Sequence, residues 1–230
     1  WRKSWDISYS VSSIALAFLL GVVLGNILQG IAIGEKYLYQ GAGFFEFLGF
    51  YPLVVGLTTL ALFMMHGAIY LLLKTEGELH NQITKLLKYG MIAFIVLYSI
   101  TTLYSLIYYP HLSDKFKNYP ILFAIPTIAI LSMANIPRLA AKKNYLSAFI
   151  FSSLTISMLL VLVAVELYPD LLISTIAPEY SLNIFNSASS KGSLEIMLII
   201  TAIGIPLVAA YTFFVYKTFW GKVKLDENSY

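Results

Sequence analysis

The sequence has no cysteine, few charged residues and only three histidines, and each shortage excludes a class of protein. Without cysteine there are no disulfides, thiolate-ligated clusters or cysteine nucleophiles. Charged residues make up 12% of the 230 residues, against about 25% in ordinary soluble domains. Three histidines are too few for a histidine-rich metal site, and no basic tract indicates a nucleic-acid partner. We therefore predict no metal site in this chain.

Apolar residues are what the sequence has in abundance, at 59% of the chain. A soluble fold of this length cannot bury so much apolar surface. A helix crosses a bilayer with about 20 apolar residues, and six stretches meet that requirement, near 7–28, 50–73, 88–109, 119–135, 146–168 and 193–216. We predict an all-α, polytopic transmembrane helix bundle that forms a single domain over 1–230.

Lysine and arginine predict the orientation of this bundle. Eleven of the fifteen fall on one side of the predicted membrane and four on the other; the four are Lys36, Lys115, Lys117 and Lys191. Positively charged connections stay in the cytoplasm. Both chain ends are therefore predicted to be cytoplasmic, and the long connections 29–49 and 169–192 to be outside.

The stretch HGAIYLLLKTEGELH, residues 66–80, carries an imidazole inside an apolar run and then a polar cluster. His66 precedes the predicted anchor Lys74 by two turns, about 12 Å along the helix. Two roles are open for His66: a hydrogen bond to a backbone carbonyl across a helix interface, or proton handling and cofactor contact. Lys74, Glu76 and Glu78 are predicted to form a cytoplasmic hairpin.

A second polar group lies at the predicted outer end of the first span. Gly21 and Gly25 have the GxxxG spacing that allows two membrane helices to approach closely. Asn26 and Gln29 follow them, and either pack in that interface or hydrogen-bond a water file or an isoprenoid head group. We keep Asn26 and Gln29, with His66, as candidates for a proton path or a cofactor contact.

The remaining polar residues have ordinary explanations. Glu166 and Glu195 lie near the predicted outer interface, where solvated carboxylates are expected. Arg138, Lys142 and Lys143 form a positive cytoplasmic loop that is also able to contact anionic lipid. No nucleophile–base pair, phosphate loop or pair of catalytic carboxylates is present, so no catalytic residue is predicted.

Three segments together resemble a known family. HGAIYLLLKTEGEL, GVVLGNILQGIAI (21–33) and NSASSKGSLEIMLIITAIGIPLVAAYTFFVYKTFWGKV (186–223) are similar in order to the second subunit of cytochrome bd quinol oxidase. The WRKSWD start resembles that family's entry into its third helix. The resemblance implies a complete subunit of about eight helices in two four-helix bundles, of which this chain would lack roughly the first two.

The resemblance also implies a function. The family's complex oxidises quinol and reduces dioxygen to water, with haems b and d in the larger first subunit. The second subunit packs against the first and helps shape proton or oxygen access, so this chain would bind no haem itself and would not be catalytic alone. Its expected partners are the first subunit and lipid, with quinone as a further candidate ligand, in the plasma membrane of a bacterium or archaeon.

The alternative function is transport of a small molecule or an ion. Transporters pair broken helices around a polar midplane site. Here the predicted midplane is almost wholly apolar, and the ionisable residues gather near the ends of the spans. This distribution favours the oxidase subunit.

Overall fold

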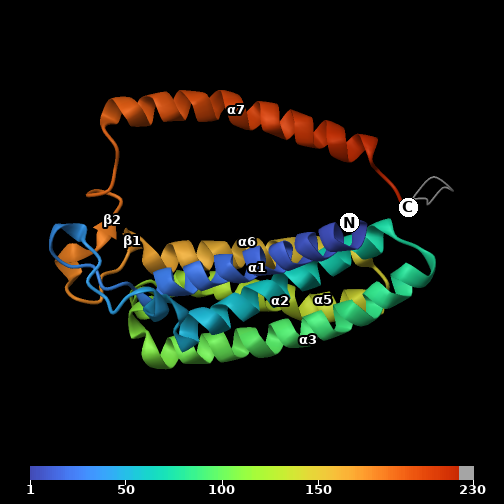
Figure 1. The fold of residues 1–230 in the computed structure, drawn as a ribbon, viewed down its shortest axis with the longest axis horizontal. Helices are drawn as coiled ribbons and strands as arrows, with labels where there is room; N and C mark the ends of the chain where they lie inside the picture. The colour runs from blue at the N-terminus through green and yellow to red at the C-terminus, as the bar shows by residue number, and fades with distance from the viewer. Residues whose placement is uncertain (223–230) are drawn as a thin grey trace.

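The structure, a computed structural model, describes residues 1–222 and confirms the predicted all-α membrane fold. Six helical segments in it are long and apolar enough to cross a membrane. Five of them, α1, α2, α3, α5 and α6, lie side by side, and α7 stands apart from them (Figure 1). Their bounds are α1 Arg2–Gln29, α2 Phe50–Lys74, α3 Gly77–Tyr108, α5 Ala124–Ala141, α6 Tyr145–Leu167 and α7 Lys191–Thr218.

Most of these helices are longer than the apolar stretches that predicted them. The 32 residues of α3 correspond to about 48 Å at 1.5 Å per residue, so the helix continues beyond a hydrocarbon core of about 30 Å. α5 continues through Pro137 to Ala141, past the predicted end of its span at 135. Proline removes a backbone donor, a loss that neighbouring groups in membrane helices compensate.

α2 is the central helix of the bundle. It packs against α1, α3 and α6, while α5 packs against α6. The main core lies at these contacts and includes the fully buried side chains of Ile69 on α2, Phe94 on α3, Ile136 on α5 and Ala148 on α6. The bundle is therefore arranged around one helix that reaches three neighbours.

The contact between α1 and α2 is a close approach of two backbones. A Cβ atom added to Gly25 would lie 2.6 Å from the Cα atom of Pro52, and one added to Gly21 would lie 2.8 Å from the Cα atom of Gly56. Real Cβ atoms do not approach other atoms so closely, so no larger residue fits at either position without movement of a helix. Both glycines of the GxxxG spacing thus face α2.

The two long connections meet at the end of the bundle opposite the N-terminus (Figure 1). β1 (Asp170–Leu172) and β2 (Leu182–Asn183) form a small antiparallel hairpin. Ser174 follows β1 and donates its hydroxyl to the carbonyl oxygen of Ile33 at 2.6 Å. The connections were predicted to share one side of the membrane, and this hydrogen bond joins them there. Between α3 and α5 the chain adds a short helix, α4 (Asp114–Asn118), at the same end.

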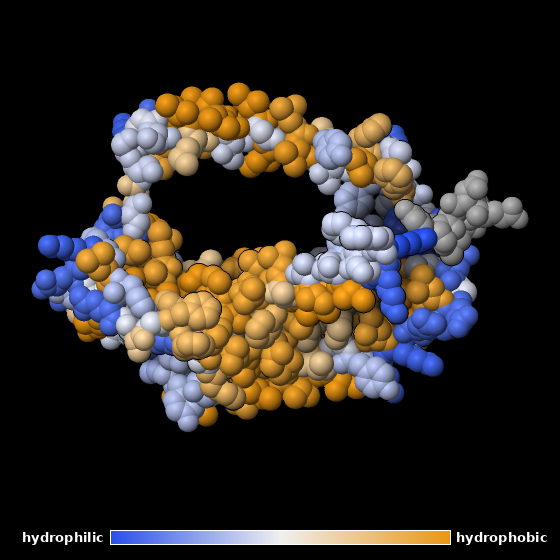
Figure 2. Space-filling model, viewed as in Figure 1, coloured by the Kyte–Doolittle hydropathy of each residue, from blue (hydrophilic) through white to orange (hydrophobic). Residues whose placement is uncertain are grey.

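The surface has the distribution expected for a membrane protein. Figure 2 shows apolar residues over the middle of the bundle and of α7, with hydrophilic residues at the two ends. α7 has no buried residue, and open space separates its middle from the bundle in this view. Lys74 at the end of α2 holds the end of α7, donating to the carbonyl groups of Phe219 at 3.0 Å and Gly221 at 3.2 Å.

Gly25→Leu is expected to destabilise the bundle. Its side chain would meet the backbone of Pro52, and overpacking of this kind costs about 1–3 kcal/mol. The measurement is the thermal unfolding midpoint of the protein in detergent.

Gly67→Leu is the matched control, because it places the same side chain in a membrane helix where nothing lies within 4 Å. We expect it to unfold at or above the temperature of the parent. Equal midpoints for both variants would show that α1 and α2 do not pack as described.

Candidate functional site

His66 is held between α2 and α6. Its Nδ1 atom lies 2.8 Å from the Oγ atom of Ser152. Ser152 itself donates to the carbonyl oxygen of Phe149 at 2.9 Å, so its oxygen is left to accept the Nδ1–H of the imidazole. The ring stacks on that of Phe149, with 4.8 Å between centroids. The interhelical hydrogen bond predicted as one role of His66 is present, but its acceptor is a hydroxyl rather than a backbone carbonyl.

The hydrogen bond to Ser152 determines which ring nitrogen of His66 carries the lone pair. With the proton on Nδ1, the lone pair of the neutral ring is on Nε2. The other two histidines lie at opposite ends of the bundle and are bonded to backbone carbonyls: His80 to Thr75 and His111 to Leu28, each at 3.2 Å. Among residues 1–222, no three His, Cys, Asp or Glu side chains are placed to share a metal ion.

Asn26 and Gln29 lie together, away from His66. Asn26 is buried and donates to the carbonyl oxygens of Val22 at 2.8 Å and Phe47 at 2.9 Å. Gln29 donates to the Oδ1 atom of Asn26 at 3.0 Å and accepts from the hydroxyl of Tyr109 at 3.2 Å. The pair thus joins α1 to the connection that follows it and to the end of α3. The structure does not bring these residues into one site with His66.

Sequence reasoning missed a set of hydroxyl pairs between α2 and α3. The hydroxyl groups of Tyr51 and Ser105 are 2.7 Å apart, and those of Thr58 and Thr101 are 2.8 Å apart. The spacing of these residues could have predicted the pairs. Tyr51 and Thr58 are seven residues apart and share one face of α2, and Thr101 and Ser105 are four apart and share one face of α3. Interhelical hydrogen bonds of this kind stabilise membrane bundles.

The prediction that Glu166 is a solvated carboxylate is wrong. Glu166 is half-buried, and Lys115 of α4 lies beside it at the end of α6. The Lys115 ammonium group donates to the carbonyl oxygens of Val165 at 2.8 Å, Glu166 at 3.0 Å and Tyr168. Burial lowers the pKa of Lys115, and the nearby carboxylates of Asp170 and Glu166 oppose that shift. A cation here complements the negative end of the α6 dipole.

The other predicted carboxylate, Glu195, is exposed and lies 3.9 Å from the ammonium group of Lys191. At the opposite end of the bundle, Lys74, Glu76 and Glu78 form the predicted hairpin between α2 and α3. Glu76 pairs with Lys222 at 2.7 Å, and Glu78 is exposed in the first turn of α3. The hairpin therefore holds the chain that follows α7.

The chain as a whole is similar to a known protein family. The sequence profile of "Cytochrome bd terminal oxidase subunit II" matches residues 1–219. The chain belongs to this family. The six candidate membrane helices among the described residues agree with the subunit II assignment.

Individual relatives agree with the subunit II family. The chain is 24% identical to "Cytochrome bd-I ubiquinol oxidase subunit 2" of Escherichia coli, over 99% of this chain and 68% of the relative. It is 29% identical to "Probable cytochrome oxidase subunit 2" of Haemophilus influenzae, over 99% of this chain and 67% of the relative. The chain thus spans about two thirds of the relatives' length.

A solved structure shares the fold. A chain of the bd oxidase from Geobacillus thermodenitrificans superposes with a TM-score of 0.74 at 15% identity, over 95% of this chain and 66% of that one. Family and fold together identify a multi-pass plasma-membrane subunit of a bd-type respiratory oxidase, as the resemblance predicted. The transporter alternative is not favoured.

Ser152→Ala is expected to destabilise the protein by about 1–3 kcal/mol, because it leaves the Nδ1–H of His66 without its acceptor. Ser153→Ala is the matched control, since Ser153 also donates to the carbonyl of Phe149, at 2.9 Å, on the same helix. The measurement is the unfolding midpoint of each variant alone and combined with His66→Ala. The loss at Ser152 should largely disappear in the His66→Ala background; equal losses in both backgrounds would contradict the hydrogen bond.

Proposed function

We propose that this chain is the haem-free membrane subunit of a complex that oxidises quinol and reduces dioxygen to water. It packs beside a haem-bearing first subunit and supports the access of protons or dioxygen to that subunit. The observation that carries the proposal is the match of the subunit II profile to residues 1–219. The similarity to the ubiquinol oxidase subunit 2 of Escherichia coli extends the proposal to quinol chemistry.

The haems b and d belong to the partner subunit in this proposal. A haem held by this chain would need an axial ligand on an open, rigid wall. His66 lies within α2, and one face of its ring is covered by Phe149. Two cavities of about 450 and 540 Å³ open on the described residues, and His66 lines neither. The donor set of residues 1–222 therefore does not fit a haem site.

The intramembrane polar residues act mainly in helix packing. Asn26, Gln29 and Ser152 each have a hydrogen-bond partner on a neighbouring side chain or backbone. His66 is the remaining candidate for proton handling or quinone contact, because the lone pair of its Nε2 atom is not used by Ser152. A proton path through this subunit would thus pass α2 rather than the Asn26–Gln29 pair.

For orientation we propose that both described ends of the chain face the cytoplasm. The charge asymmetry of the connections supports this assignment. The start of α1 lies at the same end of the bundle as the hairpin of Lys74 and Glu76 (Figure 1). The joined connections around Ser174 then lie on the outer surface.

Affinity purification through a tag on this chain tests the proposed function. We expect a second polypeptide with haem b and haem d absorption bands to copurify, together with quinol-dependent oxygen consumption. A tagged chain that purifies without a haem protein would overturn the proposal and favour a transporter.

His66→Ala tests where the haem is bound. Since the proposal places no haem iron on His66, the variant should retain all haem bands at the parental ratio of haem to protein. Ser152→Ala, which disturbs the same site without removing the imidazole, serves as its control. Selective loss of one band in His66→Ala, with both polypeptides still present, would assign that haem to this chain.

Cysteine labelling tests the orientation, because the chain has no cysteine of its own. Glu78→Cys and Ser187→Cys place a thiol on exposed residues at opposite ends of the bundle. In intact cells, a membrane-impermeant maleimide should label Ser187→Cys and leave Glu78→Cys unlabelled until the cells are opened. The reverse pattern would invert the topology.

A further inference from the structure

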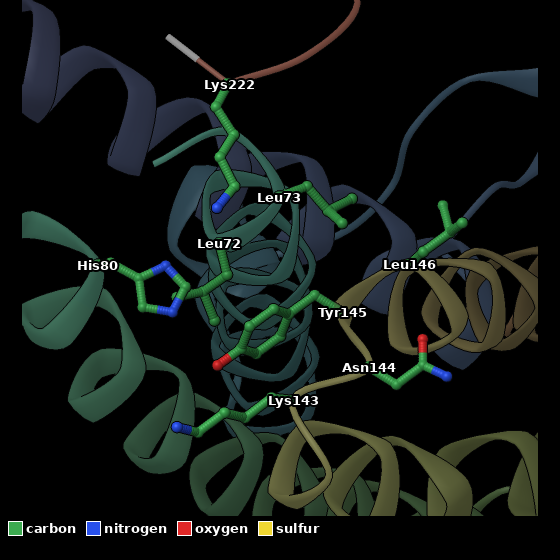
Figure 3. Close-up of a pocket in the computed structure, with 8 residues that line it drawn as sticks. All are labelled: Leu72, Leu73, His80, Lys143, Asn144, Tyr145, Leu146 and Lys222. Carbon is green, nitrogen blue, oxygen red and sulfur yellow. The ribbon is translucent and has the colours of Figure 1, made fainter. Parts of the chain in front are cut away.

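A basic cavity of about 450 Å³ lies at the end of the bundle that carries the hairpin (Figure 3). Segments far apart in the sequence form its walls. They contribute Leu72 and Leu73 from α2, His80 from α3, Lys143 and Tyr145 from the turn between α5 and α6, and Lys222 from the chain after α7. Two lysines and a histidine line this cavity, and no carboxylate does.

The turn that ends α5 fixes the position of Lys143. Its backbone N–H donates to the carbonyl of Ala140 at 2.9 Å, and that of Asn144 donates to the carbonyl of Leu139 at 3.0 Å. Lys143 has a φ of 57°, the left-handed conformation that glycine usually supplies at this position. Among residues 1–222 it forms no ion pair. The chain thus places a lysine with an available ammonium group where a glycine would suit the backbone better.

Two further polar side chains, those of His80 and Tyr145, line the same cavity. Figure 3 shows the Lys143 side chain and the Tyr145 hydroxyl extending toward the side on which His80 lies. The rings of His80 and Tyr145 are 5.4 Å apart. The Nδ1 atom of His80 lies 3.2 Å from the carbonyl oxygen of Thr75, which can only accept, so Nδ1 carries the proton. Nε2 is the ring nitrogen left for a ligand.

The opposite wall contributes less net charge. Lys222 pairs with Glu76 at 2.7 Å, so its charge is largely offset. Asn144 caps α6 by accepting the backbone N–H of Ser147 at 3.2 Å, and the N-terminus of that helix adds partial positive charge. The uncompensated cation of the cavity is therefore Lys143, which points to an anionic ligand.

The remaining wall is apolar. Leu72 is buried in the cavity wall, and Leu146 and Ile150 continue from the cavity along α6 with 55% and 57% of their surface exposed. A basic end joined to an apolar strip on a membrane helix matches a phospholipid, with its phosphate at the lysine and an acyl chain along the helix. A free phosphate ion would leave the apolar strip without a contact.

We propose that this cavity binds the headgroup of an anionic phospholipid, with Lys143 as its principal contact and Tyr145 and His80 beside the phosphate. The bound lipid fills the space between the hairpin, the turn between α5 and α6 and the chain after α7. It therefore adds a link among three segments that, within residues 1–222, are also joined by Lys74, by the Glu76–Lys222 pair and by the contact of the His80 and Tyr145 rings. This site is independent of the proposed oxidase function.

Lys143→Asn removes the charge and keeps the backbone, because asparagine tolerates the left-handed conformation. Lys142→Asn is its matched control, since Lys142 is the adjacent exposed lysine and does not line the cavity. Native mass spectrometry of the purified protein, with any partner it retains, would compare bound phosphatidylglycerol with bound phosphatidylcholine. We expect Lys143→Asn to lower phosphatidylglycerol retention about fivefold, and Lys142→Asn to retain it as the parent does.

Two results would overturn the proposal. One is equal retention of phosphatidylglycerol by the parent and both variants. The other is a combination of two observations: the parent retains the two lipids equally, and inorganic phosphate raises the unfolding temperature of the parent but not of Lys143→Asn. That combination would identify a site for free phosphate. Oxidase activity enters neither readout, so failure here is distinguishable from failure of the proposed function.

Discussion

The packing of α2 against its neighbours is the constraint on which the rest of this structure depends. Lipid chains are as apolar as leucine, so burying apolar side chains between helices gains little in a bilayer. Close approach of backbones and interhelical hydrogen bonds must hold the helices together instead. α2 provides both: α1 lies against it at Gly21 and Gly25, and hydroxyl pairs join it to α3. The His66–Ser152 hydrogen bond joins it to α6.

This use of polar groups connects the fold to the function of the chain. Here Asn26, Thr58 and His66 lie at different heights of the bundle and each bonds to a different neighbour. Each of these polar groups thus joins two segments of a chain that belongs to the subunit II family. Its long connections, joined at Ser174, close one end of the bundle, and the basic cavity around Lys143 lies at the other.

The sequence predicted the helices well, because about 20 consecutive apolar residues have few alternatives to a membrane span. The GxxxG spacing indicated a close contact for Gly21 and Gly25, but the partner helix depends on how α1 is rotated, which no local pattern determines. The same holds for Thr58 and Thr101, whose pairing requires the relative height of two helices. Glu166 was misjudged because Lys115, which lies beside it, is about fifty positions away in the sequence. Local sequence patterns likewise cannot predict contacts between distant segments, such as the cavity walls at Lys143 and Lys222.

The central claim is that polar groups inside the membrane hold neighbouring helices to α2. Thr58→Cys combined with Thr101→Cys tests it directly, since the native hydroxyl oxygens are 2.8 Å apart and the chain has no other cysteine. Mild oxidation of the purified complex should form a disulfide between α2 and α3 while the haem spectrum and oxygen consumption stay unchanged. Thr58→Cys with Ser99→Cys, on an exposed part of α3, should not cross-link. Failure of the first pair to cross-link, or loss of a haem band when it does, would contradict the account.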